Sequence, residues 1–424
     1  KKNIAEKGLV ETIQIRRERQ DKKKENARLK MELDEFLNKQ GITEKRGKEY
    51  RLALKRFFIK QAYPRIYSKH AQKPIENKIV FMERGSKISP SLKYMRDYVK
   101  EHTDYEIVQY TLMAREVSDE EYYMNAKEYV REIATAKAVF ICTANALLGH
   151  VKLRPETTYI QLWHGCGAFK KIGLSTVDKR FGKSAESHEE FPLNTGYSYV
   201  TIASPEVSWI FEEAMGIKKE DDVIVPTGIS RTDCFFDKQF IENAYQKLYE
   251  NIPQAKGKKV ILYAPTFRGT VAKCTSPDVL DVKMFAENLN DEYILIFKHH
   301  QTVKILPEIP GEYEGSFAFD MTRAENMDIN ELMIVADICI SDYSSVVFEY
   351  SLLERPMIFF TYDIEDYIDE RGLYYKFSEV APGPMFKTNE EIIDYIKNID
   401  ELFDKRVVTD FKNKFMCCCD GHSS

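Results

Sequence analysis

Short apolar runs alternate with longer amphipathic stretches from about residue 78 onward, and this alternation predicts strands and helices in turn. The runs are rich in Val, Ile and Phe and end in polar turns, which is typical of parallel strands buried on both faces. A βα series of this kind predicts an α/β fold whose polar strand ends share one edge of a sheet. The expected strands are residues 78–83, 105–112, 138–142, 158–163, 199–202 and 223–226, followed by 260–264, 293–298, 336–340 and 357–360.

This pattern divides the chain into three parts. The polar stretch of residues 251–259 interrupts the series and predicts a linker between two Rossmann-like domains that face a cleft. Residues 78–250 form the first expected domain and residues 251–424 the second. Residues 1–77 precede them as a charged helical extension, because charge is dense there and no proline occurs before position 64.

The extension carries a basic charge that the net charge of the chain conceals. Residues 1–60 contain 19 Lys and Arg against 10 Asp and Glu, although the whole chain has a net charge of −5. Within residues 51–67, Leu52, Phe57 and Phe58 lie among basic side chains, and such a segment can contact an anionic membrane surface. The alternative is a helix that docks on the folded domain and leaves its basic face in solvent.

The composition excludes several classes of protein. At 43% hydrophobic and 30% charged it is typical of a globular protein, and no run of about 18 apolar residues predicts a membrane span. The net charge does not suggest a nucleic-acid partner. The eight cysteines form no CxxC pair, so we expect no metal site and a reducing, cytoplasmic compartment. Because the first residue is Lys and not Met, we expect the chain to be a piece of a longer protein.

Residues 339–360 predict a strand, a hydroxyl-rich turn, a short helix and another strand. Asp342, Ser344 and Ser345 crowd the end of the first of these strands. A helix N-terminus offers unpaired N–H groups and partial positive charge, and the serine hydroxyls add donors, so this turn suits an anion. The alternative is an ordinary N-cap that binds no ligand.

Polar residues follow three other strands. His164 and Gly165 follow residues 158–163; a histidine there suits general-base catalysis and glycine permits close approach of a ligand, although a structural histidine is the alternative. Arg268 can pair with a diphosphate in a bidentate manner, or form a surface salt bridge. His300 follows His299, and adjacent side chains on an extended chain point to opposite faces. This geometry favours binding of the donor substrate by one of the two histidines over metal binding by both. Together these strand ends predict a base on one side of a cleft and a phosphate cradle on the other.

Five motifs occur in order along the chain: WHGCGAFKKIG, YAPTFRG, FKHHQ, SDYSSVVFEYSLLERPMIFF and CDGHSS. They resemble the CDP-glycerol glycerophosphotransferase family of teichoic acid and capsule polyol-phosphate transferases, and the likeness runs from about residue 78 to the end. The resemblance implies a GT-B fold, with the acceptor mainly in the first domain and the nucleotide donor mainly in the second. It implies transfer of glycerol phosphate or ribitol phosphate from CDP-glycerol or CDP-ribitol to a hydroxyl of a lipid-linked or nascent polymer, with release of CMP and no cofactor. The expected location is peripheral, at the cytoplasmic face of the cell membrane.

The resemblance also implies a role for each matching residue. His164 is the expected base, and His300 matches the histidine of the family's Lys-x-His-Pro motif as a second catalytic residue. Glu349, one turn into the helix after the hydroxyl-rich turn, is placed to reach a ribose hydroxyl. The expected donor-binding residues are Arg268, Asp342, Ser344, Ser345 and Glu349, with Gly165, Thr266 and Asp420 as further site candidates and no metal ligand.

Two departures and two alternatives accompany this interpretation. Gln301 replaces the proline of the family motif, and Cys166 with Gly167 stand where many members have Thr-Pro. The alternatives are a GT-B glycosyltransferase that uses a sugar nucleotide and a non-catalytic scaffold that binds a polymer. The sequence does not choose between glycerol and ribitol, name the acceptor, or distinguish a primase from a polymerase.

Overall fold

The computed structural model describes residues 2–424, apart from residues 115, 168, 178, 180, 181, 183, 270–272 and 301 and the side chains of residues 2–19, 370 and 371. Gln301, one of the two departures noted above, therefore lies outside the described residues.

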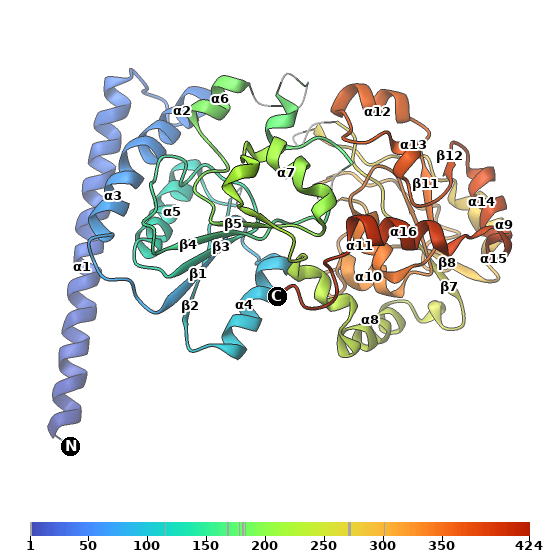
Figure 1. Cartoon of the computed structure of the whole chain (residues 1–424), viewed down its shortest axis with the longest axis horizontal. Helices are drawn as coiled ribbons and strands as arrows, with labels where there is room; N and C mark the ends of the chain where they lie inside the picture. Colours follow the sequence, from blue (N-terminus) through green and yellow to red (C-terminus); the bar gives the residue numbers. More distant parts are fainter. Residues whose placement is uncertain are drawn as a thin grey trace.

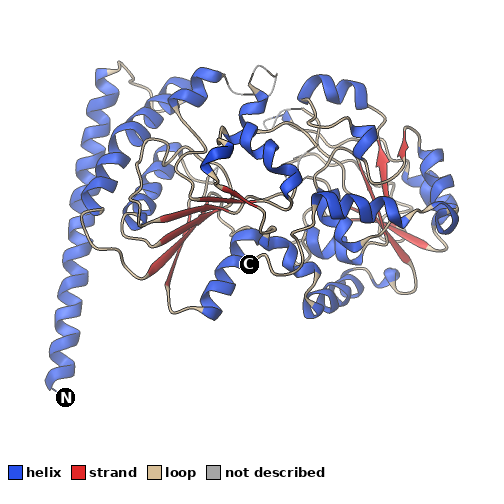
Figure 2. Ribbon diagram, viewed as in Figure 1, coloured by secondary structure: helices blue, strands red, loops and turns tan. Residues whose placement is uncertain are grey.

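Two six-stranded parallel sheets, each flanked by helices, form the body of the molecule (Figure 2). The first sheet has the order β2-β1-β3-β4-β5-β6 and the second the order β12-β11-β10-β7-β8-β9. The strands are β1 (Lys78–Glu83), β2 (Glu106–Thr111), β3 (Ala138–Ile141), β4 (Thr158–Gln161), β5 (Tyr199–Thr201), β6 (Ile224–Val225), β7 (Lys259–Tyr263), β8 (Tyr293–Phe297), β9 (Ala318–Asp320), β10 (Ile338–Ser341), β11 (Met357–Phe360) and β12 (Met385–Phe386). The sequence pattern predicted ten of them and missed β9 and β12, which form the two edges of the second sheet.

Helices cover both faces of each sheet. In the second sheet, Val260 and Leu262 of β7 pack into the same core as α10, whereas Ile261 and Tyr263 pack with α9 and α14. This alternation follows from the period of two along a strand. Because both faces of β7 are buried, apolar residues occupy successive positions along it. The helices of the two halves are α4 (Pro90–His102), α5 (Asp119–Ile133), α6 (Ala185–Glu190), α7 (Ser208–Met215), α8 (Lys238–Asn251), α9 (Val282–Leu289), α10 (Ile329–Val335), α11 (Val346–Tyr350), α12 (Ile364–Arg371), α13 (Phe377–Val380), α14 (Asn389–Lys397), α15 (Ile399–Leu402) and α16 (Lys405–Phe415).

The chain passes between the two halves more than once. Helix α8 leaves the first sheet and lies against α10 of the second, and α16 returns toward the first sheet (Figure 1). There the Ser204 hydroxyl donates to the Lys414 carbonyl at 2.6 Å, and the Cys418 N–H donates to the Ala203 carbonyl at 3.1 Å. Helix α8, which ends at residue 251, packs on α10 of the second half. The expected domain boundary between residues 250 and 251 stays a prediction.

The N-terminal extension is helical, with α1 (Lys2–Lys39), α2 (Gly47–Phe57), a π-helical turn (Phe58–Ala62) and α3 (Tyr63–His70). Figure 1 shows α1 running along one side of the molecule, with its N-terminal end beyond the other elements. Phe57 and Phe58 are 4% and 0% exposed, and the Phe58 ring stacks on Tyr123 of α5 with 5.4 Å between ring centroids. Phe57 and Phe58 therefore pack on the folded domain and do not contact a membrane. Leu52 is 37% exposed, so contact of this segment with a membrane surface stays a prediction. Within the described part of the chain, no helix combines the length and apolar character needed to cross a bilayer.

Candidate active site

His164 lies just beyond β4 in a turn that begins with strained backbone. Trp163 has a φ of 57°, a conformation that costs a side-chain-bearing residue about 1 kcal/mol or more and often occurs at functional sites. The His164 ring places Nδ1 3.0 Å from the Cys142 carbonyl oxygen, at the end of β3. Because a carbonyl only accepts hydrogen bonds, Nδ1 carries the proton, and the lone pair of neutral His164 is on Nε2.

The surroundings of His164 keep the imidazole neutral. The side chain is exposed to solvent, yet protein surrounds it on most sides. This desolvation lowers the pKa of His164, while the hydrogen bond to Cys142 opposes the change and the positive charge of Arg231 adds to it. A neutral ring with an accepting Nε2 is the state that a general base requires.

The loop after His164 lies against the second half of the molecule. A Cβ added to Gly167 would come within 2.3 Å of the Phe348 ring of α11, so this position requires glycine. At Gly165 an added Cβ would meet only the Gly167 carbonyl, at 3.9 Å, so the space there would accept a side chain. The close approach that the sequence suggested for a ligand is thus made at Gly167 by α11.

Asp342 joins the ends of two neighbouring strands of the second sheet. It follows β10, is 2% exposed, and accepts a hydrogen bond from the Thr266 N–H at 2.9 Å to Oδ1. The Thr266 hydroxyl also donates to Oδ1, and Arg268 Nη1 donates to Oδ2 at 3.0 Å. Both carboxylate oxygens are therefore occupied, and Asp342 shapes the site by holding the loop after β7 against the turn after β10.

The guanidinium of Arg268 is bound by two carboxylates. Its Nε and Nη2 donate to the two oxygens of Asp363 at 2.6 Å and 3.0 Å, and Nη1 donates to Asp342 and to the Thr266 carbonyl. Burial opposes the charge of Arg268, but the hydrogen bonds to Asp363 and the nearby Asp342 outweigh burial and raise its pKa. These bonds use four of the five N–H groups of the side chain. A diphosphate would have to compete with Asp363, which is 95 residues further along the chain and was not anticipated from the sequence.

Ser344 and Ser345 lie at the start of α11, as the sequence predicted. Both are partly exposed, and Ser344 Oγ accepts a hydrogen bond from the Val346 N–H at 3.3 Å. Ser345 is the N-cap residue and makes no side-chain capping bond. The Phe348 N–H also has a partner, the Ser345 carbonyl at 3.1 Å, so the serine hydroxyls are the donors that this turn can offer to an anion.

Glu349 is buried between the two halves. It is 2% exposed, and its Oε1 lies 3.8 Å from Nη1 of Arg231, while Oε2 has no hydrogen-bond partner among the described residues. Arg231 also donates from Nη1 to the His164 carbonyl at 3.0 Å. Arg231 follows the expected strand of residues 223–226, and no local pattern indicated that its side chain reaches across to Glu349.

The two adjacent histidines after β8 face different surroundings, as the strand geometry predicted. His300 is exposed, and its Nδ1 accepts from the Thr302 N–H at 3.3 Å and lies 2.8 Å from the Thr302 hydroxyl. Neutral His300 therefore carries its proton on Nε2 and can donate a hydrogen bond, whereas neutral His164 can accept one. The His300 ring lies 4.9 Å from that of Phe267, beside Arg268.

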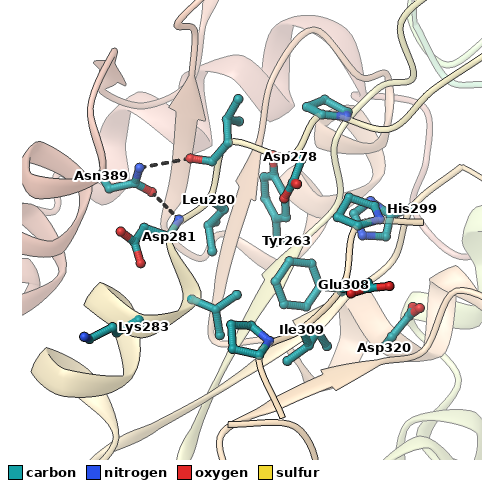
Figure 3. A pocket seen from close by; sticks show the side chains of 16 residues that line it. Tyr263, Asp278, Leu280, Asp281, Lys283, His299, Glu308, Ile309, Asp320 and Asn389 are labelled. Carbon is teal, nitrogen blue, oxygen red and sulfur yellow. Dashed lines mark hydrogen bonds between the residues drawn. The ribbon is translucent and has the colours of Figure 1, made fainter. Parts of the chain in front are cut away.

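His299 lines a separate cavity of about 410 Å³ (Figure 3). Its ring lies against Phe297, and its Nδ1 is 2.5 Å from the Ser276 hydroxyl; burial lowers the pKa of His299. Four carboxylates line this cavity against one lysine, so its charge disfavours a diphosphate. The labelled acidic side chains are Asp278, Asp281, Glu308 and Asp320.

The C-terminal segment packs on the first half. The N–H groups of Ser423 and Ser424 donate to the carboxylate of Asp233 at 3.0 Å and 2.9 Å. Asp420 is exposed, and its Oδ1 accepts from the His422 N–H at 3.1 Å, so its contacts are local. Among the described residues, no cluster of three or more His, Cys, Asp or Glu is arranged to hold a metal ion.

Contacts connect most of the expected site residues. His164, through Arg231, is joined to Glu349 of α11, and α11 begins beside Ser344 and Ser345. A second group links Asp342, Thr266 and Arg268, with His300 close to Phe267. Asp420 differs from these residues, because its described hydrogen bond lies within the C-terminal segment, with His422.

Comparison with known proteins identifies the family of the chain. The family model described as CDP-Glycerol:Poly(glycerophosphate) glycerophosphotransferase matches residues 65–424. The chain is 38% identical over 293 residues to a teichoic acid poly(ribitol-phosphate) polymerase of Bacillus spizizenii, covering 69% of this chain and 46% of that protein. It is 36% identical over 296 residues to a teichoic acid ribitol-phosphate primase of the same organism, covering 69% of this chain and 74% of the primase. The chain thus spans less than half of the first relative.

A solved structure supports the fold. The structure of the wall teichoic acid polymerase TagF superimposes with a TM-score of 0.68 at 22% sequence identity, and covers 94% of each chain. This likeness and the two parallel sheets confirm the GT-B arrangement predicted from the motifs. With a family model that matches residues 65–424, the chain belongs to the CDP-glycerol:poly(glycerophosphate) glycerophosphotransferase family.

Proposed function

We propose that the chain transfers glycerol phosphate or ribitol phosphate from a CDP-linked donor to a hydroxyl of a lipid-linked or nascent wall or capsule polymer. The observation that carries this proposal is the His164 ring, whose Nδ1 hydrogen bond leaves Nε2 as the acceptor. Nε2 takes the proton of the acceptor hydroxyl, whose oxygen attacks the β-phosphorus of the donor. The bond from that phosphorus to the bridging oxygen breaks, and CMP leaves.

The donor is proposed to bind at the strand ends of the second sheet. The Ser345 hydroxyl would donate to the diphosphate, as would His300 from Nε2. Arg268 and Asp342 would place the loop after β7 around it, and Arg268 would add positive charge. Glu349 would reach a ribose hydroxyl only if its contact with Arg231 opens.

Product analysis tests the proposed transfer. The protein is incubated with a lipid-linked acceptor and either CDP-ribitol or CDP-glycerol, and products are identified by mass spectrometry. CDP-ribitol is tested first, because both relatives described above are named for ribitol phosphate. We expect the acceptor to gain one or more polyol-phosphate units with an equal amount of CMP. A new glycosidic bond from a sugar nucleotide would favour the glycosyltransferase alternative, and binding of the polymer with no transfer from any donor would favour the scaffold.

The donor site predicts a loss of CDP affinity in two variants. Ser345→Ala and His300→Ala should each weaken CDP binding about tenfold or more, because a hydrogen bond to a charged group contributes about 1.5–3 kcal/mol. Isothermal titration calorimetry with CDP measures the change. Ser316→Ala is the matched control, since this exposed serine precedes β9 at the opposite edge of the sheet. Unchanged affinity in both variants would place the nucleotide elsewhere.

We also propose peripheral association with an anionic membrane at its cytoplasmic face, mainly through charge. The support is the exposed basic side chains of the extension, such as Arg51 and Lys60, together with the exposed Leu52. Each such charge contributes roughly 1 kcal/mol near an anionic surface, and salt weakens it over the Debye length.

Vesicle sedimentation tests this association. The protein should sediment with anionic but not neutral vesicles, and Arg51→Glu with Lys60→Glu should release it. Lys238→Glu with Lys256→Glu, two exposed residues of other regions, should not. Phe57→Ala should lower thermal stability and leave vesicle binding unchanged, because Phe57 is buried. Equal release by both charge-reversed pairs would show that the extension has no special role.

A further inference from the structure

Arg231 connects the backbone of His164 to the second half of the molecule. It lies in the segment after β6, in the 3-10 turn Ser230–Phe235. Its Nη1 donates to the His164 carbonyl at 3.0 Å, and its Nη2 donates to Asn330 Oδ1 at 2.8 Å. Asn330 is in the first turn of α10, and Glu349 of α11 lies 3.8 Å from Nη1. One side chain of the first half thus contacts the candidate base and two helices of the second.

This contact is buried and incompletely satisfied. Asn330 and Glu349 are 1% and 2% exposed, and the Arg231 side chain is 16% exposed. Among the described residues, Arg231 Nε, Asn330 Nδ2 and Glu349 Oε2 are buried without a hydrogen-bond partner. Burying a charged pair is a poor way to gain stability, because the desolvation cost offsets the attraction. A buried pair that contributes little stability is instead suited to holding two parts of the protein in a defined relative position.

The other end of the His164 loop is also held by the second half. The Lys171 N–H donates to the Gly372 carbonyl at 3.1 Å, and the Tyr374 N–H donates to the Phe169 carbonyl at 2.7 Å. Between these ends, the close approach of Gly167 to α11 leaves no room for displacement toward the helix. The position of His164 relative to the donor-binding half is therefore set at both ends of its loop.

We propose that Arg231 is a positioning residue for the transfer reaction: it holds the His164 backbone against Asn330 and Glu349, so that the base meets the donor when the two halves are in contact. This inference rests on the proposed function, with His164 as the base. Arg231 itself touches no reacting atom. Its effect on catalysis is expected through the placement of His164, because an error of about 1 Å in a reacting group can cost about 10²-fold in rate.

The charged groups around His164 provide a readout that depends on this arrangement. Desolvation is the largest influence on the pKa of His164 and lowers it. The positive charge of Arg231 also lowers it, whereas the negative charges of Glu349 and of Glu83, at the end of β1, raise it. Removing Arg231 should therefore raise the pKa of His164, and neutralising Glu349 should lower it.

The experiment compares four variants of the full chain in the transfer assay. Arg231→Gln should lower kcat about 10²-fold and leave the Kd for CDP within about twofold. The acid limb of its kcat–pH profile should move to higher pH, and that of Glu349→Gln to lower pH. Asn330→Ala keeps the charge of Arg231 but removes its tie to α10, so kcat should fall while the acid limb stays in place. Lys87→Ala is the control, because it removes an exposed ion pair to Glu325 between the same two halves and should change neither quantity.

Each outcome decides a specific point. Normal kcat in a folded Arg231→Gln protein, or a loss confined to the Kd for CDP, would overturn the positioning role. If the acid limbs of Arg231→Gln and Glu349→Gln both stayed in place, the charges of Arg231 and Glu349 would not face His164 as described, and this too would overturn the positioning role. Should Arg231→Gln fail to fold, Arg231→Lys and Asn330→Ala still test the role. Absence of transfer by the unsubstituted protein would instead refute the proposed function.

Discussion

Turnover is expected to fall by about 10²–10⁴-fold when His164 is replaced by alanine, since this is the usual contribution of a positioned general base. The hydrogen bond from Nδ1 to the Cys142 carbonyl orients the ring and leaves Nε2 to accept the proton. The Kd for CDP should change little, because His164 belongs to the first half and the donor is proposed to bind in the second. Steady-state kinetics with the polyol-phosphate donor, together with calorimetry, measure both quantities.

The pH dependence of the unsubstituted protein provides a second check of His164. A base accepts a proton only when it is neutral, and the environment of His164 holds its pKa below the ordinary value of about 6.5. Turnover should therefore persist below pH 6.5 and be lost as the pH falls through the lowered pKa. His102→Ala, which changes an exposed histidine of α4, is the matched control and should retain the rate and profile. A folded His164→Ala protein with near-normal turnover would remove His164 from the mechanism.

Asp342→Ala is expected to destabilise the second half by about 3 kcal/mol, the lower end of the cost of breaking a buried ion pair. The lower end applies because Arg268 keeps Asp363 as a partner. The Thr266 N–H and hydroxyl would lose their common acceptor, so the loop after β7 would no longer be tied to β10. The midpoint of urea unfolding should shift to lower concentration.

A matched variant separates this role from a general effect of losing a carboxylate. Asp366→Ala removes an exposed carboxylate on α12 and should change stability by less than about 0.5 kcal/mol. If Asp342→Ala unfolded at the same urea concentration as the unsubstituted protein but no longer bound CDP, Asp342 would be a direct donor ligand instead. Asp342→Asn keeps one acceptor for the Thr266 N–H. Its midpoint of urea unfolding should therefore lie between those of Asp342→Ala and the unsubstituted protein.

Arg268 and Ser345 differ in how far the surroundings of the side chain follow from the local sequence. Both follow predicted strands, and both are where the motifs indicated. Ser345 is partly exposed at the start of α11, so its own position in the chain accounts for its surroundings. Arg268 is enclosed by Asp342 and Asp363, which lie 74 and 95 residues further along. The residue type and the strand end were predictable, but the partners of the side chain were not.

The local sequence predicted ten of the twelve strands in the described part of the chain, their two series and the ends at which polar residues gather. It could do so because the period of hydrophobic positions and the turn residues act over a few neighbouring positions. Three features follow from long-range packing: Phe57 and Phe58 face the folded domain, Arg268 is paired, and Arg231 connects His164 to the second half. These contacts join segments that are far apart in the chain, and the burial that selects them exists only once the two sheets and the N-terminal helices have packed together.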